Sequence, residues 1–179
     1  MALVVNMYGG PGRGKSTTAY KLIGMLKANN YKAELVVESA KEAAYTNAIH
    51  KLQDQVFLIA MHNHDLRVLD NQVDIIITDG SLLNCLAYCS EDQQIEIDLA
   101  KELYKRFNNI GFIVPRKANY MKYGRSQTKE EAVELDNKIF QSISYLPENE
   151  RIDLQHLEGN DEEVLNTIYK HVIEKIGKQ

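Results

Sequence analysis

The glycine-rich stretch GGPGRGKST at residues 9–17 constrains the fold of this chain more than any other feature of its sequence. Four glycines and one proline occupy positions 9–14, and a pattern typical of a helix begins directly afterwards at Lys15. The run ALVVNMY at residues 2–8, which is typical of a strand, precedes the glycines. Because glycine adopts backbone conformations that a Cβ would forbid, successive N–H groups of such a turn can converge on one anion. The stretch therefore predicts an anion-binding turn between a strand and a helix.

The same stretch fits the phosphate-loop pattern G-x-x-x-x-G-K-[ST] in the context that this pattern requires, after a strand and before a helix. Lys15 is expected to reach the β and γ phosphates of a nucleotide, and the Ser16 hydroxyl is expected to bind Mg²⁺. The helix that follows would point its positive end at the same phosphates. A glycine-rich turn with an N-capping serine is the alternative interpretation. The residues expected to contact the nucleotide are Gly10, Gly12, Arg13, Gly14, Lys15, Ser16 and Thr17.

Strand-like and helix-like segments alternate along the chain, which is typical of a parallel sheet covered by helices on both faces. The strand-like segments are residues 2–8, 33–39, 73–80, 110–116 and 152–159. The helix-like segments are residues 15–28, 41–70 with a candidate break near Asn47, a long region after the fourth strand, and 161–176. The expected fold class is three-layer α/β with a parallel five-stranded sheet.

The length of 179 residues, the hydrophobic content of 44% and the three prolines fit one domain, residues 1–179, better than two. We find no internal repeat and no linker rich in Pro, Gly or Ser. No apolar run is long enough to span a bilayer, and no basic segment precedes the first strand, so we expect a soluble cytoplasmic protein. The net charge of −4 argues against a broad polyanion-binding surface but leaves room for a local basic patch that binds nucleic acid.

An acidic residue follows the most continuous apolar strand, VDIIITDG at residues 73–80. Asp79 stands where the apolar run stops, at the end of a strand that would lie beside the first one. From there its carboxylate would bind Mg²⁺ directly or through water. A strand-terminating turn aspartate before Gly80 is the alternative.

Four stretches, taken in order, resemble the P-loop small-molecule kinases, in particular the ribosylnicotinamide kinase-like and deoxynucleoside kinase-like groups and the compact, phage-like versions. They are GGPGRGKST, VVES at the end of the second strand, IIITDGS, and an arginine-bearing stretch after the fourth strand, and the resemblance covers most of the chain. It implies a three-layer α/β/α P-loop NTPase fold with a short lid, and ATP and Mg²⁺ as cofactors. In such kinases an acidic residue at the end of the second strand faces the acceptor hydroxyl. Glu38 matches that position and is the candidate general base, with Glu42 as its competitor.

The chain also departs from this family and from other P-loop proteins. Thymidylate and deoxynucleoside kinases commonly have an Asp-Arg motif after the third strand, where this chain has DGS at residues 79–81. ATPases of the remodelling type need a helical lid domain, for which 179 residues leave no room. Small GTPases have an Asn-Lys-x-Asp guanine motif, which this sequence lacks. A kinase fits the size and these omissions better.

The basic segment PRKANYMKYGRSQTKEEAVELDNKI at residues 115–139 follows the fourth strand, where P-loop kinases have their lid. We expect the lid at about residues 115–130. Arg116 and Arg125 are the candidate catalytic arginines, since guanidinium groups match phosphate in a bidentate manner and can stabilise charge on the transferred group. The alternative is a solvated approach to a helix, with tyrosines packed on the core.

The segment at residues 47–70 lies between the second and third strands, where the resemblance places the acceptor site. Gln53, Gln55 and Arg67 are candidates for binding the base or ribose of an acceptor.

Two pairs of potential metal ligands are assigned no metal. His62 and His64 stand two apart and cannot share a helix face, so we expect them on the helix surface. Cys85 and Cys89 would lie one turn apart on a helix in an apolar stretch, and we expect them to be packing residues rather than a metal pair.

Two classes of function follow from these observations. The first is an ATP- and Mg²⁺-dependent kinase that transfers the γ phosphate to a hydroxyl of a nucleoside-like acceptor: a nucleoside, a nucleotide, ribosylnicotinamide, or a hydroxymethylated pyrimidine in DNA. The second is a nucleotide-dependent switch or binding protein with slow NTP hydrolysis. Acceptor-dependent release of ADP separates the two. The partners expected for the kinase are ATP and its acceptor, with no membrane, in a monomer or a homodimer.

Overall fold

The computed structural model describes residues 1–38, 45–46, 48–90, 92–117, 120–121, 127–144 and 153–177, and these contain a five-stranded sheet. All its strand pairs are parallel. The strands are β1 (Leu3–Tyr8), β2 (Ala33–Val36), β3 (Ile75–Thr78), β4 (Asn108–Ile113) and β5 (Leu154–His156), in the order β2-β3-β1-β4-β5. β1 and β3 are buried along their whole length, as expected for strands covered on both faces.

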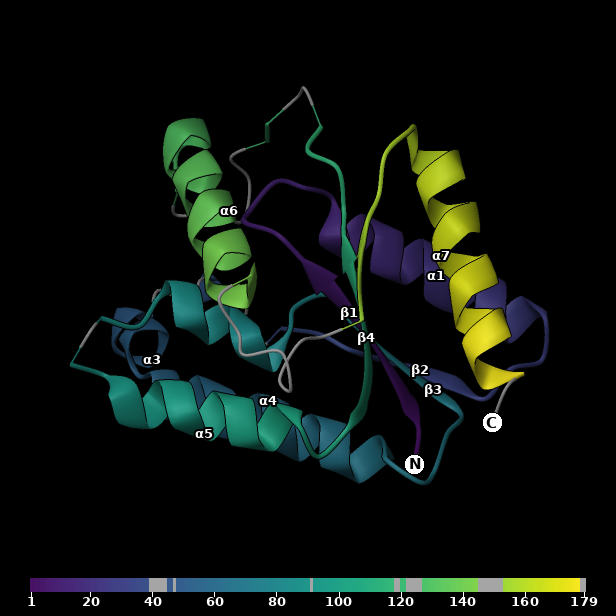
Figure 1. The fold of residues 1–179 in the computed structure, drawn as a ribbon, viewed down its shortest axis with the longest axis horizontal. Helices are drawn as coiled ribbons and strands as arrows, with labels where there is room; N and C mark the ends of the chain where they lie inside the picture. The colour runs from purple at the N-terminus through teal and green to yellow at the C-terminus, as the bar shows by residue number, and fades with distance from the viewer. Residues whose placement is uncertain are drawn as a thin grey trace.

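Helices cover both faces of this sheet (Figure 1). On one face lie α1 (Lys15–Ala28) and α7 (Asp161–Ile176). On the other lie α4 (Gln55–Leu69), the 3-10 helix η1 (Leu82–Ala87), α5 (Gln94–Tyr104) and α6 (Lys129–Ser144), with the short α3 (Ile49–Gln53) beside α4. The predicted three-layer α/β fold with a parallel five-stranded sheet is confirmed. Within the described residues, no helix has both the length and the apolar character needed to cross a bilayer.

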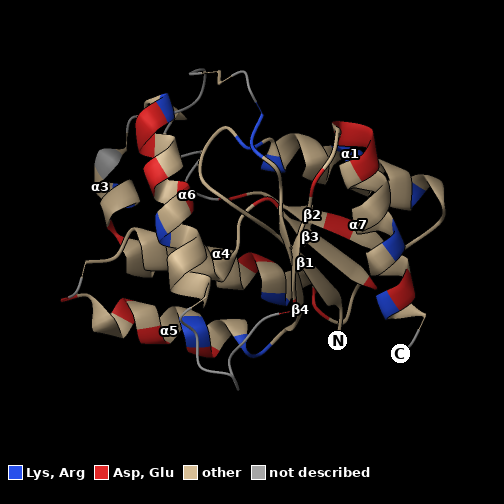
Figure 2. Cartoon of the chain, turned by 45° about the horizontal axis from the view of Figure 1, so that its top comes forward, with Lys and Arg blue, Asp and Glu red and all other residues tan. Residues whose placement is uncertain are grey.

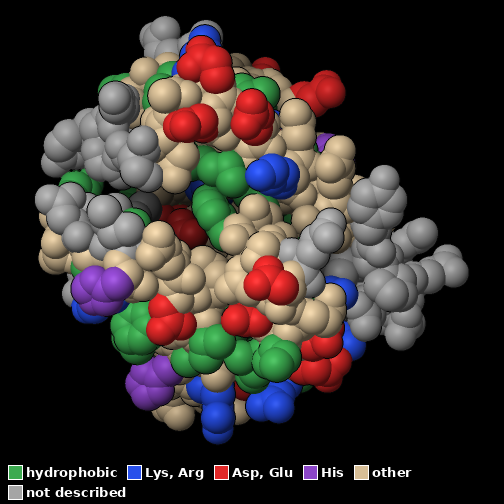
Figure 3. Space-filling view, turned by 90° about the vertical axis from the view of Figure 1, so that its left-hand side faces the viewer, with side chains coloured by type: hydrophobic (Ala, Val, Ile, Leu, Met, Phe, Trp, Pro, Cys, Tyr) green, Lys and Arg blue, Asp and Glu red, His purple; other side chains and the backbone are tan. Residues whose placement is uncertain are grey.

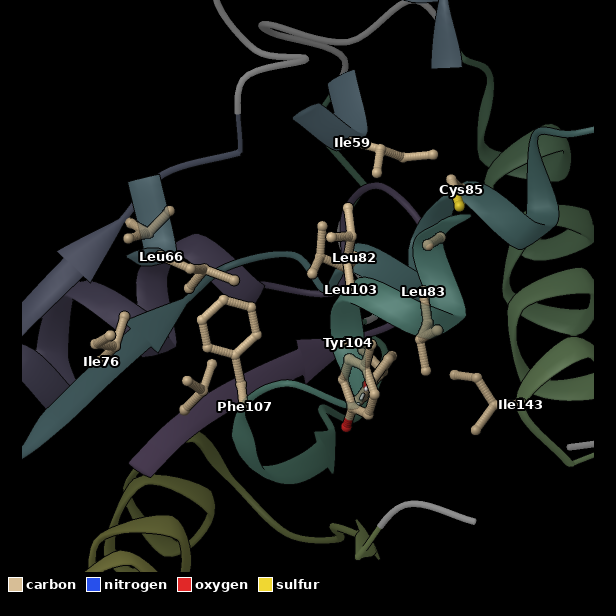
Figure 4. Packing of buried hydrophobic residues seen from close by; sticks show 14 of the residues in the cluster. Ile59, Leu66, Ile76, Leu82, Leu83, Cys85, Leu103, Tyr104, Phe107 and Ile143 are labelled. Atoms are coloured by element: carbon tan, nitrogen blue, oxygen red, sulfur yellow. Dashed lines mark hydrogen bonds between the residues drawn. The ribbon is translucent and has the colours of Figure 1, made fainter. Parts of the chain in front are cut away.

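Alternate residues of β1 face two separate cores. Leu3, Val5 and Met7 pack with residues of α1 and α7, whereas Val4 and Tyr8 pack with residues of the helices on the opposite face. Figure 4 shows the second core, where side chains from α4, η1, α5 and α6 gather over the sheet. A hydrophobic core thus packs against each face of the sheet. The loops that follow the strands begin from this packed structure.

The parallel register brings the carboxyl ends of the strands to one edge. Asn6 of β1 lies opposite Thr78 of β3 and Gly111 of β4, and Val36 of β2 also lies opposite Thr78. Open α/β sheets bind ligands outside this edge. The candidate site groups that follow these strand ends are the glycine-rich stretch after β1, Glu38 after β2, Asp79 after β3 and Arg116 after β4.

The predicted boundaries agree better for the helices than for the strands. The helices predicted at about residues 15–28 and at 161–176 agree with α1 and α7, whereas β5 occupies only residues 154–156 of the predicted 152–159. The helical pattern predicted at residues 41–70 is interrupted at Asp54, whose side chain accepts a hydrogen bond from the Phe57 amide and caps α4. The predicted break near Asn47 lies outside the described residues.

Candidate active site

The phosphate loop runs from Gly9 to Gly14, between β1 and α1. Gly9, Gly12 and Gly14 have φ angles of 128°, 83° and 85°, which residues with a Cβ rarely adopt. Gly14 is the N-cap of α1, and within the described residues the first turn of α1 has no side-chain cap and no acidic residue. In contrast, α7 begins with a capping box at Asn160 and with acidic residues. The start of α1 is therefore suited to an anion from outside the chain.

Neighbouring segments pack closely on the outer side of the loop. A Cβ at Gly10 would lie 2.7 Å from the carbonyl oxygen of Ala132 on α6. A Cβ at Gly12 would lie 2.6 Å from the ring of Tyr120. The loop glycines are thus required by packing as well as by backbone conformation, and Gly10 is the position where α6 meets the loop.

Lys15 folds back over the loop that precedes it. Its Nζ donates hydrogen bonds to Gly9 O at 2.6 Å and to Gly10 O at 3.1 Å. Ser16 and Thr17, in the first turn of α1, line the same cavity as Lys15. Of the predicted nucleotide-binding residues, those from Gly12 to Thr17 all line this cavity, whereas Gly10 packs against α6.

Glu38 and Asp79 meet at the carboxyl edge of the sheet, as expected from the ends of adjacent strands. Asp79 is 2% exposed, and its Oδ1 accepts a hydrogen bond from the Glu38 amide at 2.8 Å. The Glu38 carboxylate lies over Gly80, where an added Cβ would be 3.1 Å from Glu38 Cδ. Glu38 lines the cavity together with the loop. The competing candidate, Glu42, lies outside the described residues.

A cavity of about 840 Å³ extends from the phosphate loop along the carboxyl edge of the sheet. Figure 3 faces the side of α3 and α6 and shows a hollow there, with acidic side-chain atoms deep in it and apolar side chains beside it. Apolar and aromatic side chains form much of the wall, among them Tyr45, Leu58, Ile59, Leu82, Tyr88 and Ile139. The polar groups of the wall include Gln55, His62 and Asn84.

His62 corrects an expectation from the sequence. The expected position was the helix surface, but His62 is 6% exposed, and its Nε2 lies 3.4 Å from Thr78 Oγ1 at the end of β3. Burial lowers the pKa of His62 from 6.5 to about 4, against the opposing charges of Asp65 and Asp79. The imidazole is therefore neutral at pH 7. His64, the other histidine of the pair, is exposed as expected.

Of the three residues on α3 and α4 that were predicted to bind the acceptor, one lines the cavity and two do not. Gln55 is buried and lines the cavity, whereas Gln53 and Arg67 are exposed and are not among the described lining residues. Asn84 of η1, which no sequence pattern singled out, is 6% exposed and also lines the cavity. Its Oδ1 has no hydrogen-bond partner within the described residues. A buried amide oxygen of this kind is suited to a donor from a bound ligand.

The two cysteines lie near the cavity as free thiols. Cys85 belongs to η1 and is buried in the core, and Cys89, just after η1, packs against the same core. Burial raises the pKa of both thiols above its usual value. This environment fits the expected packing role.

Asp136 of α6 is a site residue that the sequence analysis did not single out. It is 3% exposed, and its Oδ1 accepts hydrogen bonds from the Gly10 amide at 2.6 Å and from Arg13 Nε at 2.8 Å. Its Oδ2 accepts a hydrogen bond from Arg116 Nε at 2.7 Å and forms an ion pair with Arg116 Nη2 at 2.6 Å. One buried carboxylate thus pairs with both described arginines beside the loop. Both arginines are far from Asp136 in the sequence, so no local sequence pattern could predict these ion pairs.

The predicted lid at residues 115–130 is described in part. Arg116 lies against the phosphate loop, held by Asp136, and Arg125 lies outside the described residues. Lys117 forms an ion pair with Asp161 at the start of α7, at 2.6 Å. Figure 2 shows basic residues of the segment after β4 near the start of α1. A second cavity, of about 560 Å³, lies between residues 115–117 and residues 159–162.

Comparison with known proteins supports the fold. No family model matches the chain, and no curated protein matches it. Among solved structures, the chain is similar to the crystal structure of thymidylate kinase from Ehrlichia chaffeensis, with a TM-score of 0.60 and 19% sequence identity over 98% of each chain. The order of the elements and the parallel sheet with helices on both faces are those of a P-loop NTPase α/β fold.

Proposed function

We propose that this chain is a kinase that transfers the γ phosphate of ATP to a hydroxyl group of a nucleoside-like acceptor. The observation that carries the proposal is a single cavity with the phosphate loop at one end and Glu38 on an adjacent wall. A nucleotide phosphate and a hydroxyl-bearing second substrate can lie next to each other in this arrangement. The structural likeness to a thymidylate kinase supports the same class of reaction.

The residues present fit a bound nucleotide and Mg²⁺. The loop glycines leave room for phosphate oxygens, and the first turn of α1 has no acidic residue to compete for its amides. Lys15 would bind the β and γ phosphates, and Ser16 with Asp79 would hold the metal. Bound MgATP supplies the phosphoryl group to be transferred. The second cavity lies next to the loop at Lys117, since a Cβ at Gly14 would be 2.9 Å from Lys117 Cε, and it would take the base and ribose of ATP.

Glu38 would orient the acceptor hydroxyl and accept its proton as transfer proceeds. Asp79, directly after β3, holds the backbone of Glu38 by accepting a hydrogen bond from its amide. This contact links the group that faces the acceptor to the group proposed for the metal. Arg116, and Arg125 outside the described residues, are proposed to act on charge that develops during transfer.

The remaining cavity wall suits the aromatic base and the sugar of an acceptor. Among its described lining residues, the cations are Arg13 in the phosphate loop and Lys15 at the start of α1. Aromatic side chains of Tyr45 and Tyr88 offer stacking surfaces, and the Asn84 carbonyl offers a hydrogen-bond acceptor. A nucleoside, a nucleotide, ribosylnicotinamide and a hydroxymethylated pyrimidine in DNA all present an aromatic ring that can stack on tyrosine and a hydroxyl that can donate a hydrogen bond.

A screen for acceptor-dependent release of ADP tests the proposal. Purified protein would be incubated with MgATP and each of the four acceptor classes, and the phosphorylated product identified by mass spectrometry. We expect one class to raise ADP release well above the rate without acceptor. Lys15→Ala should abolish this release because the loop loses its charge on the phosphates. ADP release that no acceptor changes, or that Lys15→Ala retains in full, would contradict the proposal.

A further inference from the structure

We propose that Asp136 is a positioning residue for nucleotide binding, which holds residues 10–13 of the phosphate loop in their binding conformation from α6. The proposal rests on the proposed function in that it takes ATP as the ligand of the loop. Asp136 itself would not touch the nucleotide. It would act through the backbone of Gly10 and through Arg13 and Arg116.

The contacts of this cluster fix the loop segment at both ends. At its start, the Gly10 amide donates to Asp136 Oδ1. At its end, Arg13 Nε donates to the same oxygen at 2.8 Å. The Arg13 guanidinium also donates to the Val114 carbonyl and lies 4.8 Å from the centre of the Phe140 ring. A single carboxylate oxygen therefore joins the two ends of residues 10–13.

Arg116 fixes the middle of the same segment. Its Nη1 donates to Pro11 O at 3.1 Å, and its Nη2 donates to Ala132 O at 3.0 Å, one turn before Asp136 on α6. The two remaining contacts of its guanidinium go to Asp136 Oδ2. Loop, helix and the segment after β4 are thus joined through one ion-pair network. Charge-assisted hydrogen bonds of this kind are shorter and stronger than neutral ones.

The loop needs such support because its conformation is costly by itself. Gly9, Gly12 and Gly14 all hold positive φ angles, and glycine loses more conformational freedom on ordering than any other residue. A loop that is ordered before ATP arrives does not lose this entropy during binding. In the cluster, one buried carboxylate faces two partly buried guanidinium groups, so its removal would leave two like charges close together without their counter-ion. Both effects predict weaker ATP binding without Asp136.

The test compares Asp136→Asn with Ile143→Ala, a control on the same helix. Asparagine has nearly the same shape as aspartate but lacks its negative charge. Its NH₂ group would also replace one oxygen that now accepts hydrogen bonds, and would face N–H donors of the cluster. Ile143 is buried on α6 and belongs to the core, so its truncation should lower the melting temperature without touching the loop. The dissociation constant for MgATP would be measured by titration calorimetry at a temperature where circular dichroism shows each variant folded.

We expect Asp136→Asn to weaken MgATP binding by about tenfold or more, since several charge-assisted hydrogen bonds are lost. Ile143→Ala should stay within about twofold of the wild type despite its lower melting temperature. Equal ATP affinity in Asp136→Asn and wild type would overturn the proposal. So would an equal loss of affinity in both variants, because that would reflect general loosening of α6.

If Asp136→Asn does not fold, Asp136→Glu provides the test. Its longer side chain keeps the charge but displaces the carboxylate from Gly10 and the arginines, and we expect several-fold weaker MgATP binding. Unchanged affinity in that variant would overturn the positioning role. Failure of the proposed function is distinguishable. If wild-type protein binds MgATP but no acceptor raises ADP release, the kinase proposal falls and the role of Asp136 in nucleotide binding is still tested. If wild-type protein binds neither MgATP nor ADP, both proposals fall. Wild-type binding with an unaffected Asp136 variant would overturn only this one.

Discussion

At the scale of single residues, the phosphate-loop glycines meet different requirements. Gly9, Gly12 and Gly14 hold positive φ angles, whereas Gly10 makes room for the backbone of α6. The motif predicted all of them as a group, since a pattern of glycines before Lys-Ser is specific. It could not assign Gly10 to α6, because that contact joins residues more than a hundred positions apart. Residue roles in this loop therefore depend on the tertiary structure.

Asp79→Asn tests the proposed metal ligand while preserving the local fold. The amide oxygen that the substitution introduces could still accept a hydrogen bond from the Glu38 amide, so the link between β2 and β3 is kept and only the charge is lost. We expect a higher Mg²⁺ requirement and ATP turnover slower by about 10²-fold or more. Initial rates over a series of Mg²⁺ concentrations would measure both effects. An unchanged magnesium dependence would remove Asp79 from the metal site.

His62 makes a pH dependence of stability testable. Its pKa is 6.5 in the unfolded chain and about 4 in the folded protein, where burial disfavours the charged form. Between these values the unfolded chain binds more protons, so stability falls as the pH decreases. His62 should reduce the free energy of unfolding by about 2 kcal/mol between pH 6.5 and about pH 5. Above pH 6.5 this contribution is fully present.

Urea denaturation at several pH values would measure this loss in the wild type and in two variants. His62→Gln should remove the corresponding part of the pH dependence. His64→Gln, which changes the exposed histidine on the same helix, should retain it. Parallel pH profiles for His62→Gln and the wild type would show that another group titrates.

At the scale of elements, helix ends could be predicted better than strand ends. Helix α1 follows a glycine-rich turn, and α7 follows the N-cap residue Asn160. The residues directly before each helix therefore predict where it starts. A strand ends where its hydrogen bonds to the neighbouring strand end. The position of that end depends on the neighbour and is not encoded in the strand's own sequence. The buried face of α4 could have been predicted from the sequence, because its buried residues follow helical spacing. They are Gln55, Ile59, His62 and Leu66. That spacing would have placed His62 inside.

The contact between α6 and the phosphate loop predicts a large effect of Gly10→Ala. The new Cβ would lie 2.7 Å from Ala132 O, a backbone atom that cannot move without displacing the helix. We expect a loss of about 2 kcal/mol in the free energy of unfolding, with weaker ATP binding. Chemical denaturation and nucleotide titration would measure the two quantities.

Gly24→Ala on α1 is the matched control for this substitution. An added Cβ at Gly24 meets no atom within 4 Å, so this change should stabilise the helix by about 0.5–1 kcal/mol. Equal stability changes for the two glycines would contradict the assigned contact between Gly10 and α6.

At the scale of the whole molecule, the parallel sheet explains why residues distant in sequence share one site. Crossovers return each strand in the same direction, so the groups after β1, β2, β3 and β4 meet at one edge. The sequence predicted Lys15 for this edge from the phosphate-loop pattern and Asp79 from the end of an apolar run. Glu38 was predicted from the resemblance to P-loop small-molecule kinases. Asp136 and Asn84 could not be found in this way, since they lie on helices whose packing determines what they face.

The central claim, that this cavity transfers phosphate to an acceptor, is tested most directly by Glu38→Gln. ATP dissociation constants and ADP release, with and without acceptor, would be measured for this variant and for the wild type. We expect nearly unchanged ATP affinity and acceptor-dependent turnover reduced by about 10²-fold or more, because Glu38 is proposed to orient the acceptor and not to bind ATP. ADP release that is equal in the two proteins and insensitive to every acceptor would contradict it, and would indicate a nucleotide-hydrolysing switch instead.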